Sequence, residues 1–307
     1  MTQHKNTSIP TGVPISESRE ELQTKQSLPL VTIGLPVFNG ENFLEEAIES
    51  LIGQSFGDFE LIISDNASTD STKDIVERFL KRDPRVRYIR QPKNIGAARN
   101  FVFVLEQART ELFMWASHDD IWAENWLEVL TKNITHQDIG IRGRLLLMQE
   151  DSVIADKVLP SFRQGDSLRC FLGNENNHRS HYVYSLFNRE KLLTTKLETI
   201  NVDYYPDAIF VYCLVQQGSL RTITETYLRY RLHDRNLGHD YSNPWKGWEK
   251  ILYRIHPLRY YIYYIRYSKN TITKCTIFLF IPVKHIYSQI SFWIRGFRQI
   301  ITNRAAV

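Results

Sequence analysis

Four short polar motifs between Val31 and Asp120 decide how this chain is expected to fold. They read Leu35-Pro36-Val37-Phe38-Asn39, Asp65-Asn66-Ala67-Ser68-Thr69-Asp70, Asn94-Ile95-Gly96-Ala97-Ala98-Arg99-Asn100 and Ser117-His118-Asp119-Asp120. Each motif follows a short apolar run that is typical of a buried parallel strand. In open α/β sheets, ligands bind just beyond the carboxyl ends of such strands. The motifs therefore predict one shared site, whose carboxylates, amides and arginine suit a nucleotide and a divalent ion.

The spacing of apolar residues around these motifs predicts alternating strands and helices. Apolar runs predict strands at 28–37, 59–64, 86–89 and 111–116, and helical periodicity follows at 41–52, after Asp70, after Asn94 and at 121–130. Such alternation is typical of an α/β fold with an open, mostly parallel, Rossmann-like sheet flanked by helices. Further along, the sequence predicts strands at 139–148, 182–187 and 220–232, helices from Arg189 and at 207–216, and a loop over the site at 164–181.

Composition and charge divide the chain into three parts. Residues 1–28 are predicted to be a flexible arm, because they carry too little apolar surface to offset the entropy of ordering. Residues 29–240 form the predicted sheet domain. The tail, residues 241–307, has a charge of +10 in a chain whose total is +4, which leaves −6 elsewhere. The tail also holds 15 of the 38 aromatic residues, so we expect a basic, aromatic-rich helical segment.

Several classes of protein are disfavoured by the same numbers. The three cysteines fit no zinc or redox spacing, and we interpret them as buried thiols in a reducing compartment. The first thirty residues lack the apolar core of a secretory signal, so a cytoplasmic location is expected. No nucleic-acid partner is expected, because the body of the chain is acidic. No Ser/His/Asp or Cys/His nucleophile set is visible.

The carboxylates at the strand ends each allow two interpretations. Asp65 could accept a hydrogen bond from a nucleobase, or it could be an ordinary turn residue. Asp119 and Asp120 are adjacent like charges, which are easier to explain if a cation such as Mg²⁺ or Mn²⁺ binds there. The alternative is a solvated loop that caps the following helix. Asp207 opens a predicted helix, where a capping carboxylate is the ordinary role.

The remaining candidates carry amides, a guanidinium and an imidazole. Asn94 and Gly96 with Arg99 could surround a phosphate or a base, or they could form a helix start with a surface arginine. His233 could serve a metal or a diphosphate, or it could be a structural histidine. The sequence leaves both pairs of interpretations open.

The four motifs together resemble glycosyltransferase family 2, whose members have the GT-A fold. The resemblance covers about residues 29–235 and is strongest up to Trp122. It implies an inverting transferase that uses a nucleotide-diphospho-sugar donor, a divalent metal (Mn²⁺ or Mg²⁺) and a saccharide acceptor. It also implies a role in polysaccharide or cell-envelope glycan synthesis, where the acceptor can be lipid-linked.

The resemblance also implies roles for individual residues. Pro36, Phe38 and Asn39 would line the nucleotide pocket, and Asp65 would contact the base with Arg99 nearby. Asn94 and Gly96 would complete the donor site. Asp119 together with Asp120 would bind the metal and the diphosphate, His233 would lie on the strand end that returns to the diphosphate, and Asp207 would be the catalytic base.

Three positions depart from the family pattern. Ser117 stands where the metal motif usually has its first Asp, Asn66-Ala67 stands where Asp-Gly is more common, and Pro206 replaces the usual acidic residue before Asp207. Because of the first and third departures, a nucleotide-sugar-binding protein without activity stays open as an alternative. A nucleotidyltransferase is the other alternative, although Val37-Phe38-Asn39-Gly40-Glu41 is not the Gly-rich, Lys-bearing loop that would support it.

The tail suggests where the protein works. Its basic and aromatic residues are expected to form amphipathic helices that lie on an anionic membrane surface, at the inner face of the membrane. Its longest apolar run is far shorter than the roughly 20 residues of a spanning helix. The alternative is that the aromatics pack against the sheet domain.

Overall fold

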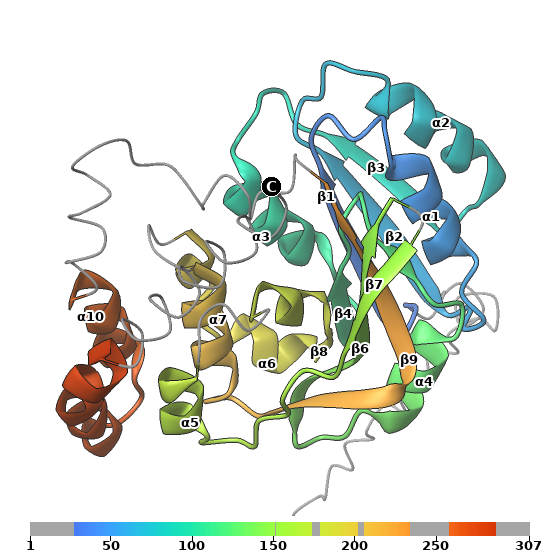
Figure 1. Ribbon diagram of the computed structural model, residues 1–307. Helices are drawn as coiled ribbons and strands as arrows, with labels where there is room; N and C mark the ends of the chain where they lie inside the picture. Colours follow the sequence, from blue (N-terminus) through green and yellow to red (C-terminus); the bar gives the residue numbers. More distant parts are fainter. Residues whose placement is uncertain (1–27, 151, 174–178, 202–205, 234–257, 287–307) are drawn as a thin grey trace, which may run out of the picture.

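The structure of the protein, a computed structural model, describes residues 28–150, 152–173, 179–201, 206–233 and 258–286. These residues form one nine-stranded sheet with helices on both faces (Figure 1). The strand order is β3-β2-β1-β4-β8-β6-β9-β5, and β7 pairs with β6 beside this path. The predicted α/β class, a mostly parallel sheet flanked by helices, is confirmed.

The first half of the sheet is parallel. Its elements are β1 (Val31–Val37), α1 (Leu44–Ile52), β2 (Phe59–Asp65), α2 (Thr72–Arg82), β3 (Val86–Arg90), α3 (Ala97–Gln107) and β4 (Leu112–Trp115). β1 pairs with β2 and β4, and β2 pairs with β3. The register sets Val37 beside Asp65 and Asp65 beside Arg90. The carboxyl ends of these strands therefore meet at one edge, where the polar motifs follow.

The second half of the sheet mixes both directions. Its elements are β5 (Ile121–Trp122), α4 (Trp126–Asn133), β6 (Asp138–Gln149), β7 (Ser152–Lys157), α5 (Ser167–Leu172), the 3₁₀ helix η1 (Arg179–Tyr184), β8 (Leu186–Asn188), α6 (Arg189–Leu193), the 3₁₀ helix η2 (Leu197–Asn201), α7 (Pro206–Leu214) and β9 (Ser219–Leu232). β9 runs parallel to β6 and antiparallel to β5. This arrangement brings the end of β9 back to the loop that follows β4.

Three predictions of local structure are wrong. Residues 121–130 begin as strand β5, because Ile121 pairs with Arg229 of β9, and the helix starts only at Trp126. Residues 164–181 contain α5 and the start of η1 instead of a loop. The strand expected at 182–187 is shorter, because η1 continues to Tyr184. Strand β7 was not predicted from the sequence.

Apolar side chains pack on both faces of the sheet. One cluster joins β1, β2 and β4 to α1, α2 and α4. The other surrounds Trp115, whose ring lies 4.9 Å from Phe113, 5.7 Å from Phe187 and 6.0 Å from Phe210. Burial on both faces explains why the parallel strands read as continuous apolar runs.

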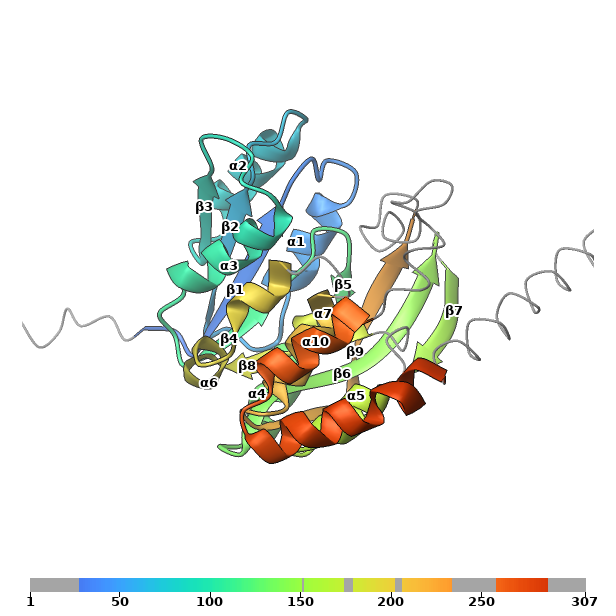
Figure 2. The same ribbon diagram turned by 90° about the vertical axis from the view of Figure 1, so that its left-hand side faces the viewer.

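The described part of the tail consists of α10 (Leu258–Tyr267) and helical residues 271–286. Both views place it beside α5 and α7 (Figure 2). Tyr264 packs edge-on against Tyr212 and Phe171, with ring centroids 4.8 and 5.0 Å away. The Tyr212 hydroxyl lies 2.6 Å from Ser268 Oγ. None of the described helices is long and apolar enough to cross a membrane. Residues 1–27 lie outside the described residues.

Candidate active site

The loop after β1 is tied to the loop after β2 through Asn39. Asn39 has a left-handed φ of 51°. Its backbone N–H donates to Ser68 Oγ over 2.9 Å, and its Oδ1 accepts from the Thr69 N–H over 2.9 Å. Phe38, the preceding residue, is 43% exposed although its side chain is aromatic. An exposed ring at the edge of the sheet is a suitable surface for a flat nucleobase.

Pro36 is buried within β1 and shapes the end of that strand. Val37 accepts from Asn66 on the β2 side and Gly34 accepts from Ala116 on the β4 side. Because the backbone groups of successive residues in β1 point alternately to β2 and to β4, the nitrogen of Pro36 points toward β4. It lies beyond Trp115, where β4 has ended. The missing N–H of proline therefore breaks no ladder bond.

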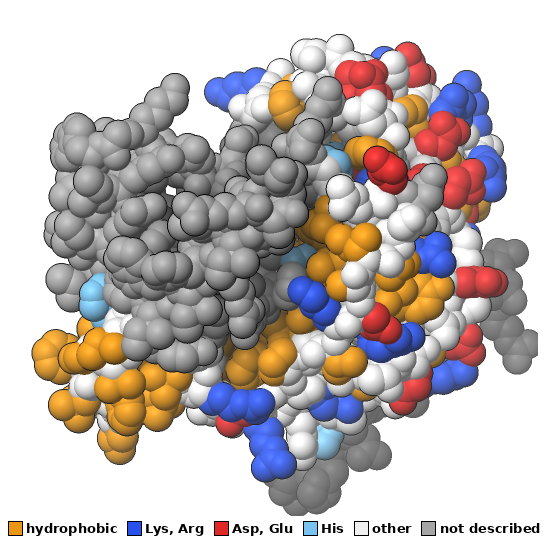
Figure 3. Space-filling model, in the orientation of Figure 1, with side chains coloured by type: hydrophobic (Ala, Val, Ile, Leu, Met, Phe, Trp, Pro, Cys, Tyr) orange, Lys and Arg blue, Asp and Glu red, His pale blue; other side chains and the backbone are white. Residues whose placement is uncertain are grey.

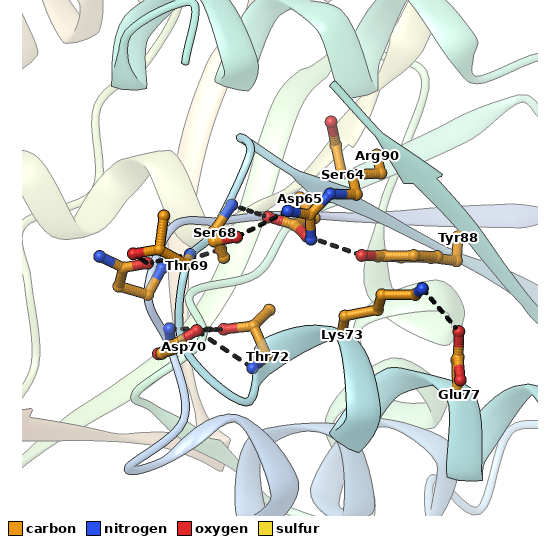
Figure 4. A network of polar contacts seen from close by, with 12 residues as sticks. Ser64, Asp65, Ser68, Thr69, Asp70, Thr72, Lys73, Glu77, Tyr88 and Arg90 are labelled. Atoms are coloured by element: carbon orange, nitrogen blue, oxygen red, sulfur yellow. Dashed lines mark hydrogen bonds and ion pairs between the residues drawn. The ribbon is translucent and has the colours of Figure 1, made fainter. Parts of the chain in front are cut away.

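Asp65 is the centre of a polar network at the end of β2 (Figure 4). Its Oδ1 accepts from the Ser68 N–H over 2.7 Å, and its Oδ2 accepts from Tyr88 Oη over 2.6 Å and from Arg90 Nη1 over 2.8 Å. Burial and the bond to Asp65 raise the pKa of Tyr88 to about 12. Asp65 is fully buried, whereas the Arg90 side chain is 41% exposed. The polar group that this network presents to solvent is therefore the guanidinium of Arg90.

Asn94 and Gly96 join the loop after β3 to the loop after β2. Asn94 Oδ1 accepts from Asn66 Nδ2 over 3.0 Å and from the Gly96 N–H over 2.8 Å. Asn66 Oδ1 in turn accepts from the Ile95 N–H over 2.8 Å. Gly96 has a φ of 85°, which favours glycine, at the residue before α3. The structure brings both residues to the predicted edge.

Arg99 lies apart from this network. Its guanidinium pairs with Glu106 on the exposed side of α3, with N–O distances of 3.1 and 3.3 Å. No described contact joins it to Asp65 or Asp119. The charged partner of Asp65 is Arg90, which the sequence analysis did not single out. The sequence could have indicated Arg90, because this residue directly follows the expected third strand, as the other site residues follow theirs.

The loop after β4 places two carboxylates side by side in the interior. Asp119 is 7% exposed and Asp120 is fully buried. Asp119 Oδ2 lies 2.9 Å from His233 Nε2, and Ser117 Oγ bonds Asp119 Oδ1. Burial alone would raise the pKa of Asp119, but the imidazole of His118, the Ser117 hydroxyl and His233 lower it below its usual value. His233 therefore lies beside the acidic pair.

Asp120 has one oxygen that no described residue hydrogen-bonds. Its Oδ1 accepts from the Arg231 N–H over 3.0 Å, while Oδ2 is buried without a hydrogen-bond partner among the described residues. Burial, followed by the charge of Asp119, raises the pKa of Asp120 well above its usual value. A buried acceptor beside a second carboxylate is a suitable ligand for a hard divalent cation. The described residues contain no cluster of three or more His, Cys, Asp or Glu side chains that could hold a metal ion.

Asp207 lies in the first turn of α7. Asp207 is an exposed residue, and desolvation of its carboxyl raises the pKa to about 6. Tyr230, near the end of β9, is close enough to Asp207 and to the acidic pair for all three carboxylates to affect its pKa. Burial raises the pKa of Tyr230, and the charges of Asp120, Asp119 and Asp207 raise it further. All three carboxylates therefore lie within electrostatic range of one phenol.

Comparison with known proteins identifies the family of the chain. Residues 32–195 match the family model described as glycosyl transferase family 2. TuaG of Bacillus subtilis (strain 168), named for teichuronic acid biosynthesis, is 25% identical over 257 residues, which are 80% of this chain and 97% of TuaG. An uncharacterised glycosyltransferase of Haemophilus influenzae is 34% identical over 194 residues, 61% of this chain and 73% of its own length. The Campylobacter jejuni GalNAc(5)-diNAcBac-PP-undecaprenol beta-1,3-glucosyltransferase is 31% identical over 127 residues, 41% of each chain.

Solved structures share the fold at low sequence identity. Staphylococcus aureus TarS 1-349 in complex with UDP-GlcNAc has a TM-score of 0.57 at 16% identity and covers 80% of this chain and 69% of its own. The mannosyltransferase PcManGT of Pyrobaculum calidifontis, in complex with GDP-Man and Mn²⁺, has a TM-score of 0.52 at 18% identity, covering 86% of this chain and 70% of its own. These similarities show a common architecture.

Proposed function

The chain belongs to glycosyltransferase family 2, and from this we propose that it transfers a sugar from a nucleotide-diphospho-sugar to an acceptor hydroxyl with inversion. The observation that carries the proposal is the adjacent pair Asp119 and Asp120 at the carboxyl edge of the sheet, with Asp207 within electrostatic range of the same residue, Tyr230. This set offers a place for a charged diphosphate and a separate carboxylate for the acceptor. A nucleotidyltransferase would not need the separate carboxylate that serves the acceptor.

The donor is bound along the edge formed by the first three motifs. The exposed ring of Phe38 and the Asp65–Arg90 pair receive the nucleobase. Asn39 holds the loop that carries Phe38, and Asn94 with Gly96 holds the adjoining loop. Asp119, Asp120 and His233 lie at the end where the diphosphate is placed. In this proposal Arg99 does not contact the base, because its guanidinium pairs with Glu106.

Asp119 and Asp120 are the residues that would hold a divalent ion, Mn²⁺ or Mg²⁺. The unbonded Oδ2 of Asp120 supports this assignment, and the Mn²⁺ complex of PcManGT provides a precedent in a protein of the same fold. When bound, such an ion neutralises the charge that develops on the leaving diphosphate. Ser117 hydrogen-bonds Asp119, so it supports that carboxylate in place of a second acidic ligand.

Asp207 acts as the general base in this proposal. Its carboxylate accepts the proton of the acceptor hydroxyl while that oxygen attacks the anomeric carbon from the face opposite the diphosphate. A correctly placed base is worth about 10²–10⁴ in rate. The raised pKa of Asp207 brings it closer to the operating pH, which suits a group that takes up a proton during the reaction.

A donor panel tests this function directly. UDP-, GDP- and dTDP-sugars are incubated with the protein and Mn²⁺ or Mg²⁺, and release of the nucleoside diphosphate is measured with and without chelator. We expect release from one donor class, and we expect Asp119→Ala to abolish it in a folded protein. As a control, Asp156→Ala changes an exposed carboxylate on β7 and should retain activity. Full activity of Asp119→Ala, or in excess chelator, contradicts the metal assignment.

The acceptor in this proposal is a lipid-linked saccharide at the inner face of a membrane. The names of TuaG and of the Campylobacter enzyme, which specifies an undecaprenol-linked acceptor, support a cell-envelope glycan. Residues 258–286 contain five Lys or Arg residues and no Asp or Glu. Basic residues contribute about 1 kcal/mol each at an anionic leaflet.

One face of the tail helix at 271–286 is apolar and open to solvent. Ile277 on its inner side is buried, while the outer side exposes Ile272, Leu279, Val283 and Ile286 by 54–79%. Apolar side chains gather over this helix in the space-filling view (Figure 3). An apolar face flanked by basic residues is the pattern of a helix that lies in a lipid interface. This face supports the membrane part of the proposal.

A further inference from the structure

Arg231, close to the end of β9, hydrogen-bonds three residues in two other segments, the loop that carries the acidic pair and α1. Its Nε donates to the backbone oxygen of Asp119 over 3.1 Å, and its backbone N–H donates to Asp120 Oδ1 over 3.0 Å. Its Nη2 donates to Glu46 Oε2 on α1. The three partners lie 185, 112 and 111 residues away in the sequence, so the side chain ties distant parts of the chain together.

The guanidinium is held in one plane by its surroundings. Its central carbon lies 4.6 Å from the centre of the Phe43 ring, and the side chain is only 10% exposed. The Phe43 ring also lies 5.0 Å from the ring of His233. The Phe43 ring therefore packs against both Arg231, among the last residues of β9, and His233, just after the strand, and both of these contact the acidic pair. A guanidinium with its two edges bonded and one face stacked has little freedom to rotate.

We propose that Arg231 is a positioning residue that fixes Asp119 and Asp120 in the geometry that a divalent cation requires. The inference rests on the proposed metal-dependent function. The side chain sets the Asp119 carbonyl, and hence the orientation of the peptide that joins the two acidic residues. The backbone of Arg231 occupies Asp120 Oδ1, so Asp120 Oδ2 is the oxygen left to a cation. Residues that orient metal ligands typically change metal affinity about 10–100-fold when they are substituted.

Charge and geometry make opposite predictions for substitutions at this position. If Arg231 acted mainly as a positive charge near the site, its removal would strengthen cation binding. The pairing with Glu46 largely balances that charge. Arg231→Lys separates the two effects, because lysine keeps the charge but has no planar fork that can reach both the Asp119 carbonyl and Glu46. A geometric role predicts that the lysine variant loses affinity.

Arg221 provides a matched control on the same strand. Its guanidinium bonds both carboxylate oxygens of Asp138 at 2.8 Å and the backbone oxygen of Asn133. Like Arg231, it joins β9 to a carboxylate and to a carbonyl, but it lies at the opposite end of the strand. Arg221→Lys should therefore reproduce any general loss of stability without changing the site.

The experiment titrates Mn²⁺ into the full chain with saturating UDP, GDP or dTDP in turn, monitored by electron paramagnetic resonance, together with melting temperatures. We expect Arg231→Lys to weaken Mn²⁺ binding by about tenfold or more and Arg221→Lys to leave it within about twofold. Glu46→Ala, a change on the exposed side of α1, should weaken it in the same direction while the fold is retained. Unchanged affinity in both Arg231→Lys and Glu46→Ala would overturn the inference. Absence of Mn²⁺-dependent binding of all three nucleotides to the unsubstituted protein would overturn the metal assignment, and the inference with it.

Discussion

Asp207 is the side chain on which proton transfer depends in the proposed reaction. Its pKa is raised from the usual 3.8 to about 6, and only the ionised form can accept a proton. We therefore expect kcat/KM to rise with pH up to about 6 and then level off, with roughly one-tenth of the plateau remaining at pH 5. Asp207→Asn should reduce kcat by about 10²–10⁴ while donor affinity changes little.

A pH profile of kcat/KM checks this assignment. Asp203→Asn is the control, because it removes a second carboxylate four positions earlier in the sequence. If Asp207→Asn keeps its turnover and Asp203→Asn loses it, the base is Asp203. A profile that is flat between pH 5 and 7 would also contradict the role of Asp207.

Ala67 occupies a backbone conformation that favours glycine. Its φ is 62°, in the turn that follows β2. An L-residue with a Cβ pays about 1 kcal/mol for this conformation, so we expect Ala67→Gly to increase the free energy of unfolding by about 1 kcal/mol. Ala98→Gly, within α3, should instead lower it by about 0.5–1 kcal/mol. Urea unfolding compares the two, and equal destabilisation by both would show that the turn is not strained.

For single residues, the sequence predicted which of them gather at one edge of the sheet better than it predicted their contacts. Residues at strand ends, such as Asp65 and Asp119, are located by the ends of the apolar runs. The ion pair of Arg99 with Glu106 was not predicted, although Glu106 lies two turns further along the same helix. Arg231 was missed, since its contacts depend on a return of the chain across more than 100 residues.

The strand pair β6–β9 lies in the second half of the sheet, and β9 returns the chain to the acidic pair. Its register shifts between Arg142 and Arg144, where β9 contains extra residues. Gly143 lies at this shift, and a Cβ there would come within 2.4 Å of the Thr226 backbone oxygen. We expect Gly143→Ala to lower the free energy of unfolding by about 1–3 kcal/mol. Gly57→Ala, where no atom lies within 4 Å, should change it by less than about 0.5 kcal/mol. Thermal and urea unfolding give both values, and equal effects would contradict the close approach.

Elements with strong periodicity were predicted, and elements made by tertiary pairing were not. Strands β1, β2 and β4 are buried on both faces, so their apolar runs identify them. Strand β7 exposes Val153 and Ile154 by 51% and 54%, and it has no alternation that could reveal it. β5 forms because β9 returns to pair with Ile121, which helical spacing alone cannot predict.

The whole molecule divides into an acidic body and a basic tail with an open apolar face. We expect the protein to float with vesicles that contain phosphatidylglycerol and to be released by salt. Replacing Leu279 and Val283, 71% and 54% exposed, with Glu should abolish flotation. Replacing Val153 and Ile154 with Glu places the same charges on an equally exposed apolar strand and should preserve it. Equal loss in both variants, or no flotation of the unsubstituted protein at low salt, contradicts membrane docking.

The configuration of the product tests the central claim most directly. Once the donor panel has identified a substrate, the anomeric configuration of the transferred sugar is read by proton NMR during the reaction. Direct attack by an acceptor activated by Asp207 predicts complete inversion, so an α-linked donor gives a β-linked product in a reaction that stops in chelator. A product that retains the configuration of the donor, or transfer that continues without a divalent ion, would contradict it.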